Sequence, residues 1–279
     1  MSAGSLQLFS LRTKLLVFAA ALVLVPGGIY GTIAVSSSRA AVAEVIGRQL
    51  VEEARNAADR LATTLRSESR RLEWFAVQDV MREIRIGDLD KRISSLLASG
   101  KSSCPACIDL FVLDDRGGVV ASSNPARIGA KEPPGGDAAA GVTIEGPLAA
   151  DGAASSMLRL ALPIPDPDRP RSRLGRLVAL LDWRRTSEVL VQARANLASV
   201  GLEPDILIVD RGGVVIGGAI RAAGRWQPGS RIALPSPDPL DPATTGQVDA
   251  EIGVLLGQQR LPDDLPPWSV VVAEPLADA

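Results

Sequence analysis

Hydrophobic positions between residues 39 and 86 follow the spacing of a long helix. This stretch contains no proline and one glycine, and its apolar side chains recur mostly in steps of three and four. They are Leu50, Ala54, Ala57, Leu61, Leu65, Leu72 and Phe75, with Glu68 interrupting the series. Such spacing places the side chains on one face of a helix. We therefore expect a single helix about 70 Å long, which either packs on a globular domain or pairs with a second copy of itself.

Beyond this helix the pattern becomes typical of short strands joined by turns. Residues 88–97 first predict a short helix. Strands are expected at residues 108–113, 119–122, 157–164 and 174–182, with a turn at 114–118 and an irregular loop around Gly135 and Gly136. Residues 184–199 then predict a second helix, because their apolar side chains fall on one side of it.

The order of elements then repeats. Residues 205–209 predict a strand, 210–213 a turn, and Val214 begins another strand. The hexapeptide DRGGVV at residues 115–120 recurs identically at 210–215, and each copy follows an apolar strand that begins with an aspartate. A pair of closing strands also ends each unit, within residues 157–182 and 248–274. This duplication predicts two small α+β domains with antiparallel sheets, stacked along the long helix.

The N-terminal region has the pattern of a membrane anchor. No charged residue occurs across the 24 positions 15–38, whereas Arg12 and Lys14 precede them with no acidic residue before Lys14. About 20 apolar residues suffice to span a bilayer, and the basic flank predicts a cytoplasmic N-terminus. A cleaved signal peptide has a similar pattern. Either interpretation exports the rest of the chain, and an uncleaved anchor would hold it at the inner membrane.

Composition narrows the classes of function. The 279 residues are 46% apolar, so they can bury a sizeable core. A net charge of −2 with 3% aromatic residues argues against nucleic-acid binding. The chain has no histidine, which excludes histidine metal sites, Ser-His and Cys-His nucleophiles and histidine-ligated haem. We expect no cofactor and no enzymatic activity in this chain, since a hydrolase built on carboxylates alone would need a paired-acid motif that is not apparent.

The strand motifs resemble those of double Cache sensor domains. Residues 110–114 (LFVLD), 118–124 (GVVASSN) and 128–129 (IG) are similar to the first hairpin of such domains, and residues 175–182 (GRLVALLD) and 267–275 (PWSVVVAEP) are similar to their closing strands. The resemblance covers about residues 36–276. It implies an α+β fold with an N-terminal transmembrane helix, a long periplasmic helix and two stacked, PAS-like antiparallel-sheet modules.

The resemblance also implies a division of the chain. Its segments would be a cytoplasmic tail (1–14), a transmembrane anchor (15–38), a long signalling helix with a short helix (39–103), a membrane-distal module (104–200) and a membrane-proximal module (201–276). The distal module would bind a small extracellular ligand. The receptor would be a homodimer joined through the long helix, and the signal would pass to a histidine kinase, diguanylate cyclase or chemoreceptor segment.

Two further expectations concern the extent and role of the chain. Receptors of this family continue with a second span, whereas this sequence ends at Ala279. We therefore expect either a fragment of a longer receptor or a sensor with a single anchor. The alternative function is a membrane-anchored periplasmic module that binds another protein and no small molecule.

Four charged residues are candidates for ligand binding. Arg159 is the first, because related modules carry a carboxylate-binding arginine in a similar strand and guanidinium donates two parallel hydrogen bonds to a carboxylate. Its alternative is an ordinary solvent-facing arginine. Asp182 resembles a ligand-binding aspartate of the family, or it caps the helix that follows. Arg82 and Arg85 are weaker candidates on an arginine-rich helix. The only tyrosine is Tyr30, so the aromatic pocket of amino-acid sensors is not apparent, which leaves a small carboxylate or no ligand at all as the alternatives.

Cys104 and Cys107 are the only cysteines. In an oxidising compartment their two-residue spacer favours a local disulfide. A redox-active pair would place the first cysteine at a helix N-terminus, and a strand is expected here instead. A zinc site would need two further ligands, which the absence of histidine and of other cysteines makes hard to supply.

Overall fold

A computed structural model describes residues 11–132, 141–149, 156–169, 172–221, 224–232, 234, 247–249 and 253–275. It has a long helix followed by two antiparallel sheets, as the sequence predicts. The glycine pair at 135–136 and the start of the chain up to residue 10 lie outside the described residues.

The long helix α1 spans Leu11–Ala76, so it is continuous with the uncharged N-terminal stretch. It ends ten residues earlier than expected, since η1 (Asp79–Ile86) is a 3-10 helix that stops at Gly87 with φ 74°. The short helix α2 spans Arg92–Ser102, later than the predicted 88–97. The displacement follows from Asp88, whose buried carboxylate accepts hydrogen bonds from the backbone N–H groups of Ile93 and Ser94 and so sets the start of the helix.

The first sheet contains five strands, four of which were predicted. They are β1 (Cys107–Leu113), β2 (Val119–Ser122), β3 (Thr143–Ala149), β4 (Ser156–Pro165) and β5 (Arg173–Asp182), and the spatial order is β2-β1-β5-β4-β3. The short 3-10 helix η2 (Pro125–Arg127) follows β2. Sequence patterns missed β3, whose register is interrupted by a bulge between Glu145 and Leu148. That bulge breaks the alternation by which strands are recognised.

Two short helices, α3 (Trp183–Thr186) and α4 (Glu188–Ala198), lead to the second sheet. Its strands are β6 (Asp205–Val209), β7 (Val215–Ala219), β8 (Gln247–Asp249), β9 (Val254–Arg260) and β10 (Ser269–Pro275). Their order, β7-β6-β10-β9-β8, repeats that of the first sheet strand for strand. The duplicated pattern in the sequence therefore corresponds to a duplicated topology.

The structural repeat is shifted by one residue from the repeated hexapeptide. In the first turn, Asp114 Oδ1 accepts hydrogen bonds from the N–H groups of Arg116 and Gly118. In the second, Asp210 Oδ1 does the same for Gly212 and Val214. Asp114 is therefore equivalent to Asp210, although the hexapeptides begin at residues 115 and 210. Turn geometry, and not sequence identity, sets the register of the two modules.

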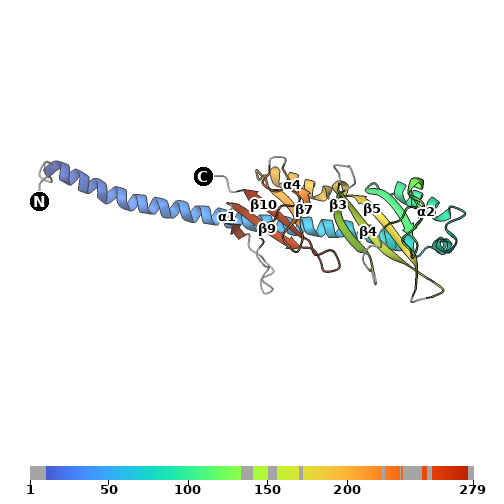
Figure 1. Ribbon diagram of the computed structural model, residues 1–279. Helices are drawn as coiled ribbons and strands as arrows, with labels where there is room; N and C mark the ends of the chain where they lie inside the picture. The colour runs from blue at the N-terminus through green and yellow to red at the C-terminus, as the bar shows by residue number, and fades with distance from the viewer. Residues whose placement is uncertain are drawn as a thin grey trace, which may run out of the picture.

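Both sheets pack against α1, and Figure 1 shows them one after the other along it. The apolar seam of α1 is buried there, including Leu50, Leu61 and Leu65. The second sheet is nearer the N-terminus, and α1 extends well past it (Figure 1). The contact is closest at Gly257 of β9, where a Cβ atom would lie 2.4 Å from the backbone carbon of Leu50. The sequence left two explanations for this apolar seam, packing on a globular domain or pairing with a second copy of the helix. Packing on the two sheets explains it.

The two modules also touch each other directly. Trp183, the first residue of α3 directly after β5, packs edge-to-face on Trp268, which precedes β10, with ring centroids 6.0 Å apart. Both side chains are buried, and a Cβ atom at Gly217 would lie 2.4 Å from Trp183 Nε1. The aromatic pair joins the closing strands of the two sheets. Within the residues described in full, no helix combines the length and apolarity needed to cross a membrane.

Candidate functional site

The strand β4 presents its two faces to different environments. Leu158, Leu160 and Leu162 belong to the large core beneath the sheet, which includes the seam of α1. Arg159 alternates with them and points to the outer face, as the strand pattern predicts. It is nevertheless only 8% exposed, so it is not the solvent-facing arginine of the alternative interpretation. A buried guanidinium on a sheet face needs an electrostatic explanation.

One carboxylate, that of Glu145, partly compensates the buried positive charge of Arg159. Arg159 Nη1 donates to Glu145 Oε2 at 3.0 Å, and the two residues lie directly opposite each other in the β3–β4 pairing. The second terminal nitrogen, Nη2, is buried and has no hydrogen-bond partner among the residues that the structure describes. An unmet charged donor is costly inside a protein. This nitrogen therefore provides a position where an acceptor would be stabilised.

The neighbouring residues on this face are mainly apolar. Leu180 of β5 lies opposite Arg159, and Met157 is two residues away along β4. Leu180 and Met157 belong to a small apolar cluster that also contains Phe111, Leu113, Val119, Ala161 and Val178. Apolar surroundings lower the local dielectric and so strengthen a hydrogen bond between Arg159 and an incoming anion. The arrangement can hold a small carboxylate by charge-assisted hydrogen bonds and apolar contact.

The sequence did not single out a second buried ion pair on the same sheet. Asp109, 2% exposed, lies 2.8 Å through Oδ2 from Arg127 Nε, and its Oδ1 accepts hydrogen bonds from the hydroxyls of Ser122 and Ser123. Arg127 also stacks over the ring of Phe111 at 4.7 Å. An aspartate beginning an apolar strand is the sequence signal that could have identified the pair.

The second module contains an equivalent of this pair. Asp205, at the start of β6, is 1% exposed and accepts hydrogen bonds from the backbone N–H and the guanidinium of Arg221. Because both modules have the pair at the start of their first strand, we assign it to the fold, where it holds the segment after the hairpin. The Asp109–Arg127 pair is therefore not part of the candidate ligand site.

Arg159 has no such equivalent. Aligning Asp114 with Asp210 makes Phe111 equivalent to Leu207, and the strand registers then place Leu256 at the position of Arg159. In the second module Leu256 belongs to an apolar cluster that also includes Trp226. The position of the buried, incompletely paired arginine in the first module is thus occupied by an apolar side chain in the second.

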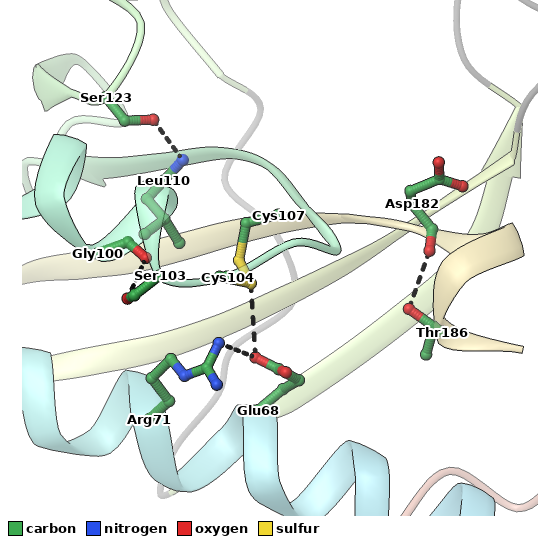
Figure 2. Close-up of a disulfide and its surroundings, with 10 residues drawn as sticks. All are labelled: Glu68, Arg71, Gly100, Ser103, Cys104, Cys107, Leu110, Ser123, Asp182 and Thr186. Carbon is green, nitrogen blue, oxygen red and sulfur yellow. Dashed lines mark hydrogen bonds and ion pairs between the residues drawn. A yellow bond between two sulfur atoms is a disulfide. The ribbon is translucent and has the colours of Figure 1, made fainter. Parts of the chain in front are cut away.

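Asp182 is engaged as a helix cap. Its Oδ1 accepts a hydrogen bond from the backbone N–H of Arg184 at 2.9 Å, and its carbonyl accepts one from the hydroxyl of Thr186 (Figure 2). Of the two roles expected from the sequence, the structure thus places Asp182 in the capping one. The residue is two positions beyond Leu180 on the strand that faces Arg159.

Arg82 and Arg85 lie at the far tip of the first module and pair there with other groups. Arg85 donates to Asp166 at 2.6 Å and to Asp168 at 2.8 Å, which ties η1 to the β4–β5 connection. Arg82 lies 3.7 Å from Asp79 and lines a cavity of about 180 Å³ with mainly apolar walls. None of the contacts described for these two arginines involves Arg159.

Cys104 and Cys107 form a disulfide at the start of β1. Cys104 Sγ lies 3.8 Å from Glu68 of α1, which pairs with Arg71 at 3.1 Å (Figure 2). Glu68, which interrupts the apolar seam, therefore faces the disulfide. The three groups Glu68, Cys104 and Cys107 could bind a metal only after reduction, because disulfide sulfurs are not thiolates.

Comparison with known proteins supports the fold. No protein-family model matches the sequence, and no curated protein matches it. Among solved structures, the sensor domain of the histidine kinase DctB from V. cholerae matches with a TM-score of 0.54 and 13% identity, over 81% of this chain and 97% of that one. The ligand-binding domain of the Pseudomonas fluorescens chemoreceptor CtaA, in complex with L-valine, matches with 0.55 and 14%, over 85% and 99%.

A third match shows that relatives can be longer. An extracellular ligand binding receptor from Desulfohalobium retbaense matches with a TM-score of 0.56 and 12% identity, over 81% of this chain, and this chain spans 40% of it. With the strand order and the long helix, these matches give the chain the double Cache fold of extracytoplasmic sensor domains. At such identities they show the fold and not the ligand.

Proposed function

We propose that this chain is the extracytoplasmic ligand-sensing region of a membrane-anchored bacterial signalling receptor. The observation that carries the proposal is the buried Nη2 of Arg159, which has no partner in the described chain. In the second module, Leu256 occupies the position equivalent to Arg159. Structural neighbours that are sensor and ligand-binding domains support the same function. The first module would be the ligand-binding one.

The ligand class follows from the charge of the site. A guanidinium with one terminal nitrogen free favours an anionic acceptor, and a carboxylate oxygen is such an acceptor. Apolar neighbours such as Leu180 and Met157 favour a short hydrocarbon portion. We therefore propose a small carboxylate. The capping bond to Arg184 uses Asp182 Oδ1, so a ligand amine would contact the second oxygen of this carboxylate.

Anchoring and signal relay are further parts of the proposal. The uncharged residues 15–38 with Arg12 and Lys14 before them support a span with a cytoplasmic N-terminus. The helix α1 is continuous from Leu11 to Ala76, so it would transmit a displacement of the sheets to the membrane. A homodimer through α1 would have to use its polar outer face or the part beyond the sheets, because the apolar seam is occupied.

Substitution of Arg159 in the purified full chain tests the ligand site. Charge-assisted hydrogen bonds contribute about 1.5–3 kcal/mol, so Arg159→Ala should weaken carboxylate binding by about 10- to 150-fold. Acetate, succinate and L-valine would serve as probes in calorimetric titrations and thermal-shift assays. Arg159→Lys should recover only part of the affinity, because an ammonium lacks the planar fork.

The control is Arg66→Ala, which removes an exposed arginine paired with Asp264 at 2.6 Å, in the second module. It should leave binding unchanged. Wild-type affinity retained by folded Arg159→Ala would refute the site. If neither wild type nor a Glu145→Gln variant binds a small carboxylate, the protein-interaction alternative is favoured. Exposed apolar side chains near the tip of the first module, including Trp74, Val77 and Leu89, are the observation that supports this alternative.

A further inference from the structure

We propose that Glu145 is an internal competitor for Arg159, and that a ligand carboxylate binds by displacing it. This inference rests on the proposed function, because it concerns the same arginine. It assigns to Glu145 the role of setting the affinity of the site. The observation behind it is the single hydrogen bond between Arg159 Nη1 and Glu145 Oε2, at 3.0 Å, beside an unsatisfied Nη2.

The hydrogen bonding of Arg159 is incomplete in a way that a ligand could improve. Glu145 contacts only one of the two terminal nitrogens. A free carboxylate that approaches both can form the paired, parallel hydrogen bonds that make arginine–carboxylate contacts strong. Glu145 is attached to a strand directly opposite Arg159, so its approach is limited by the backbone. A mobile ligand has no such restriction.

The charge balance makes the two carboxylates exclusive. Arg159 is 8% exposed, so its single positive charge is best stabilised by a single counter-ion. A ligand carboxylate that arrived while Glu145 stayed in place would put two negative charges beside one positive charge. Like charges at this distance in a partly buried site repel strongly. Binding is therefore an exchange of one carboxylate for another.

Glu145 is placed where it can leave. Its side chain is 34% exposed, in contrast to that of Arg159, so a turn toward solvent would rehydrate its carboxylate. It lies on β3, the edge strand of the sheet, immediately before the bulge that separates it from Leu148. Among the described strands, only β4 is hydrogen-bonded to β3. Displacing it requires no rearrangement of the central strands β1 and β5.

The exchange has a measurable consequence. Glu145→Gln keeps the size of the side chain and removes its charge, so Arg159 is held more weakly in the unliganded protein. Titration calorimetry on the purified full chain should show acetate or succinate binding about tenfold more tightly to this variant than to wild type, a difference of about 1.4 kcal/mol. Acetamide, which is similar in shape but uncharged, should gain nothing.

The matched control is Asp264→Asn, which removes the carboxylate of the exposed Arg66–Asp264 pair in the second module. It should leave carboxylate affinity at the wild-type value. Binding by Glu145→Gln alone, with none detectable in wild type, would also support the exchange. Unchanged or weaker carboxylate binding in Glu145→Gln would overturn it.

The two proposals fail in different ways. If Arg159→Ala abolishes binding and Glu145→Gln has no effect, the ligand site stands and the competitor is wrong. If Glu145→Gln weakens the binding of L-valine, Glu145 contacts the ligand amine and is not a competitor. If neither wild type nor Glu145→Gln binds any carboxylate, both proposals are wrong.

Discussion

At the scale of single residues, burial alone does not separate a functional charge from a structural one. Asp109 is buried more deeply than Arg159, but it is ion-paired with Arg127 and hydrogen-bonded by two serine hydroxyls, and Asp205 of the second module is likewise paired with an arginine. Arg159 has an unmet donor and Leu256 at its equivalent position. The internal duplication thus acts as a control within one chain, because a feature of the fold recurs in both modules and a feature of one ligand site does not.

Glu274 permits a test by pH at the same scale. Burial raises the pKa of Glu274, as do the nearby carboxylates of Glu203 and Asp205, whereas the Glu203 backbone N–H and the positive charge of Arg221 oppose the shift. A carboxyl group with a raised pKa binds its proton more tightly in the folded state. Its contribution to stability is therefore present below its ordinary pKa and is lost as pH rises through the raised value.

We accordingly expect Glu274→Gln to melt at a higher temperature than wild type at pH 7. The amide keeps the oxygen that accepts from Glu203 and removes the charge. The difference should shrink as the pH falls toward about 4, where the carboxyl of wild type is also neutral. Thermal melts between pH 4 and pH 7 measure this difference in melting temperature. The control is Glu73→Gln, which changes an exposed glutamate in the same way. A difference in melting temperature that grows as the pH falls would contradict the upward shift of the Glu274 pKa.

At the scale of elements, α1 determines how both sheets are held. Its apolar seam lies against them, and the outer side of the same stretch is mainly polar, with Val45 and Trp74 as exposed apolar side chains. The contact with the second sheet is unusually close at Gly257, where the Cα lies against the backbone of Leu50 and Val51. Glycine is needed here because of the close approach of the strand to the helix.

Gly257→Ala should therefore destabilise the protein by about 1–3 kcal/mol, the usual cost of overpacking a close contact. The new Cβ would lie 2.4 Å from the carbonyl carbon of Leu50 and 2.5 Å from the nitrogen of Val51, and backbone atoms cannot turn aside. Chemical denaturation should show a lower midpoint. The control is Asn56→Ala on the exposed side of the same helix. An unchanged midpoint would mean that the helix and the strand move apart to accommodate the new methyl group without loss of stability.

At the scale of the whole molecule, two sheets of one topology lie along a single helix, with the Trp183–Trp268 pair between them. The first module is far from the N-terminal end of α1 and the second is near it (Figure 1). The described C-terminal strand, β10, ends on the side toward the N-terminal end of α1. Both ends of the described chain are therefore directed toward the proposed membrane surface.

The proposed topology predicts the side on which the C-terminus lies. A reporter enzyme fused after Ala279 should be active only if it is a periplasmic type, because Arg12 and Lys14 keep the N-terminus in the cytoplasm. Paired fusions to a periplasmic and a cytoplasmic reporter in a bacterial host measure this. Replacing Arg12 and Lys14 with glutamate is the control, and it should reduce periplasmic activity. Activity of the cytoplasmic reporter in the unmodified chain would overturn the topology.

Local patterns in the sequence were sufficient for much of the fold. The seam of α1, the hairpins after Leu113 and Val209, and the closing strands follow from periodicity and turn residues, which act over a few neighbours. The duplication was visible too, although Asp114 and Asp210 show that its register is one residue away from the identical letters. Strand β3 was missed because its bulge interrupts the alternation that identifies strands.

The candidate site depended on contacts between distant residues. Sequence placed Arg159 on the outer face of its strand, but only the pairing of β3 with β4 brings Glu145 opposite it, and only the assembled sheet buries it. The same holds for Asp182, whose capping bond to Arg184 depends on where the following helix begins. The burial and the partners of a side chain are set by segments that come together on folding. They cannot be predicted from the pattern of residues along a single strand.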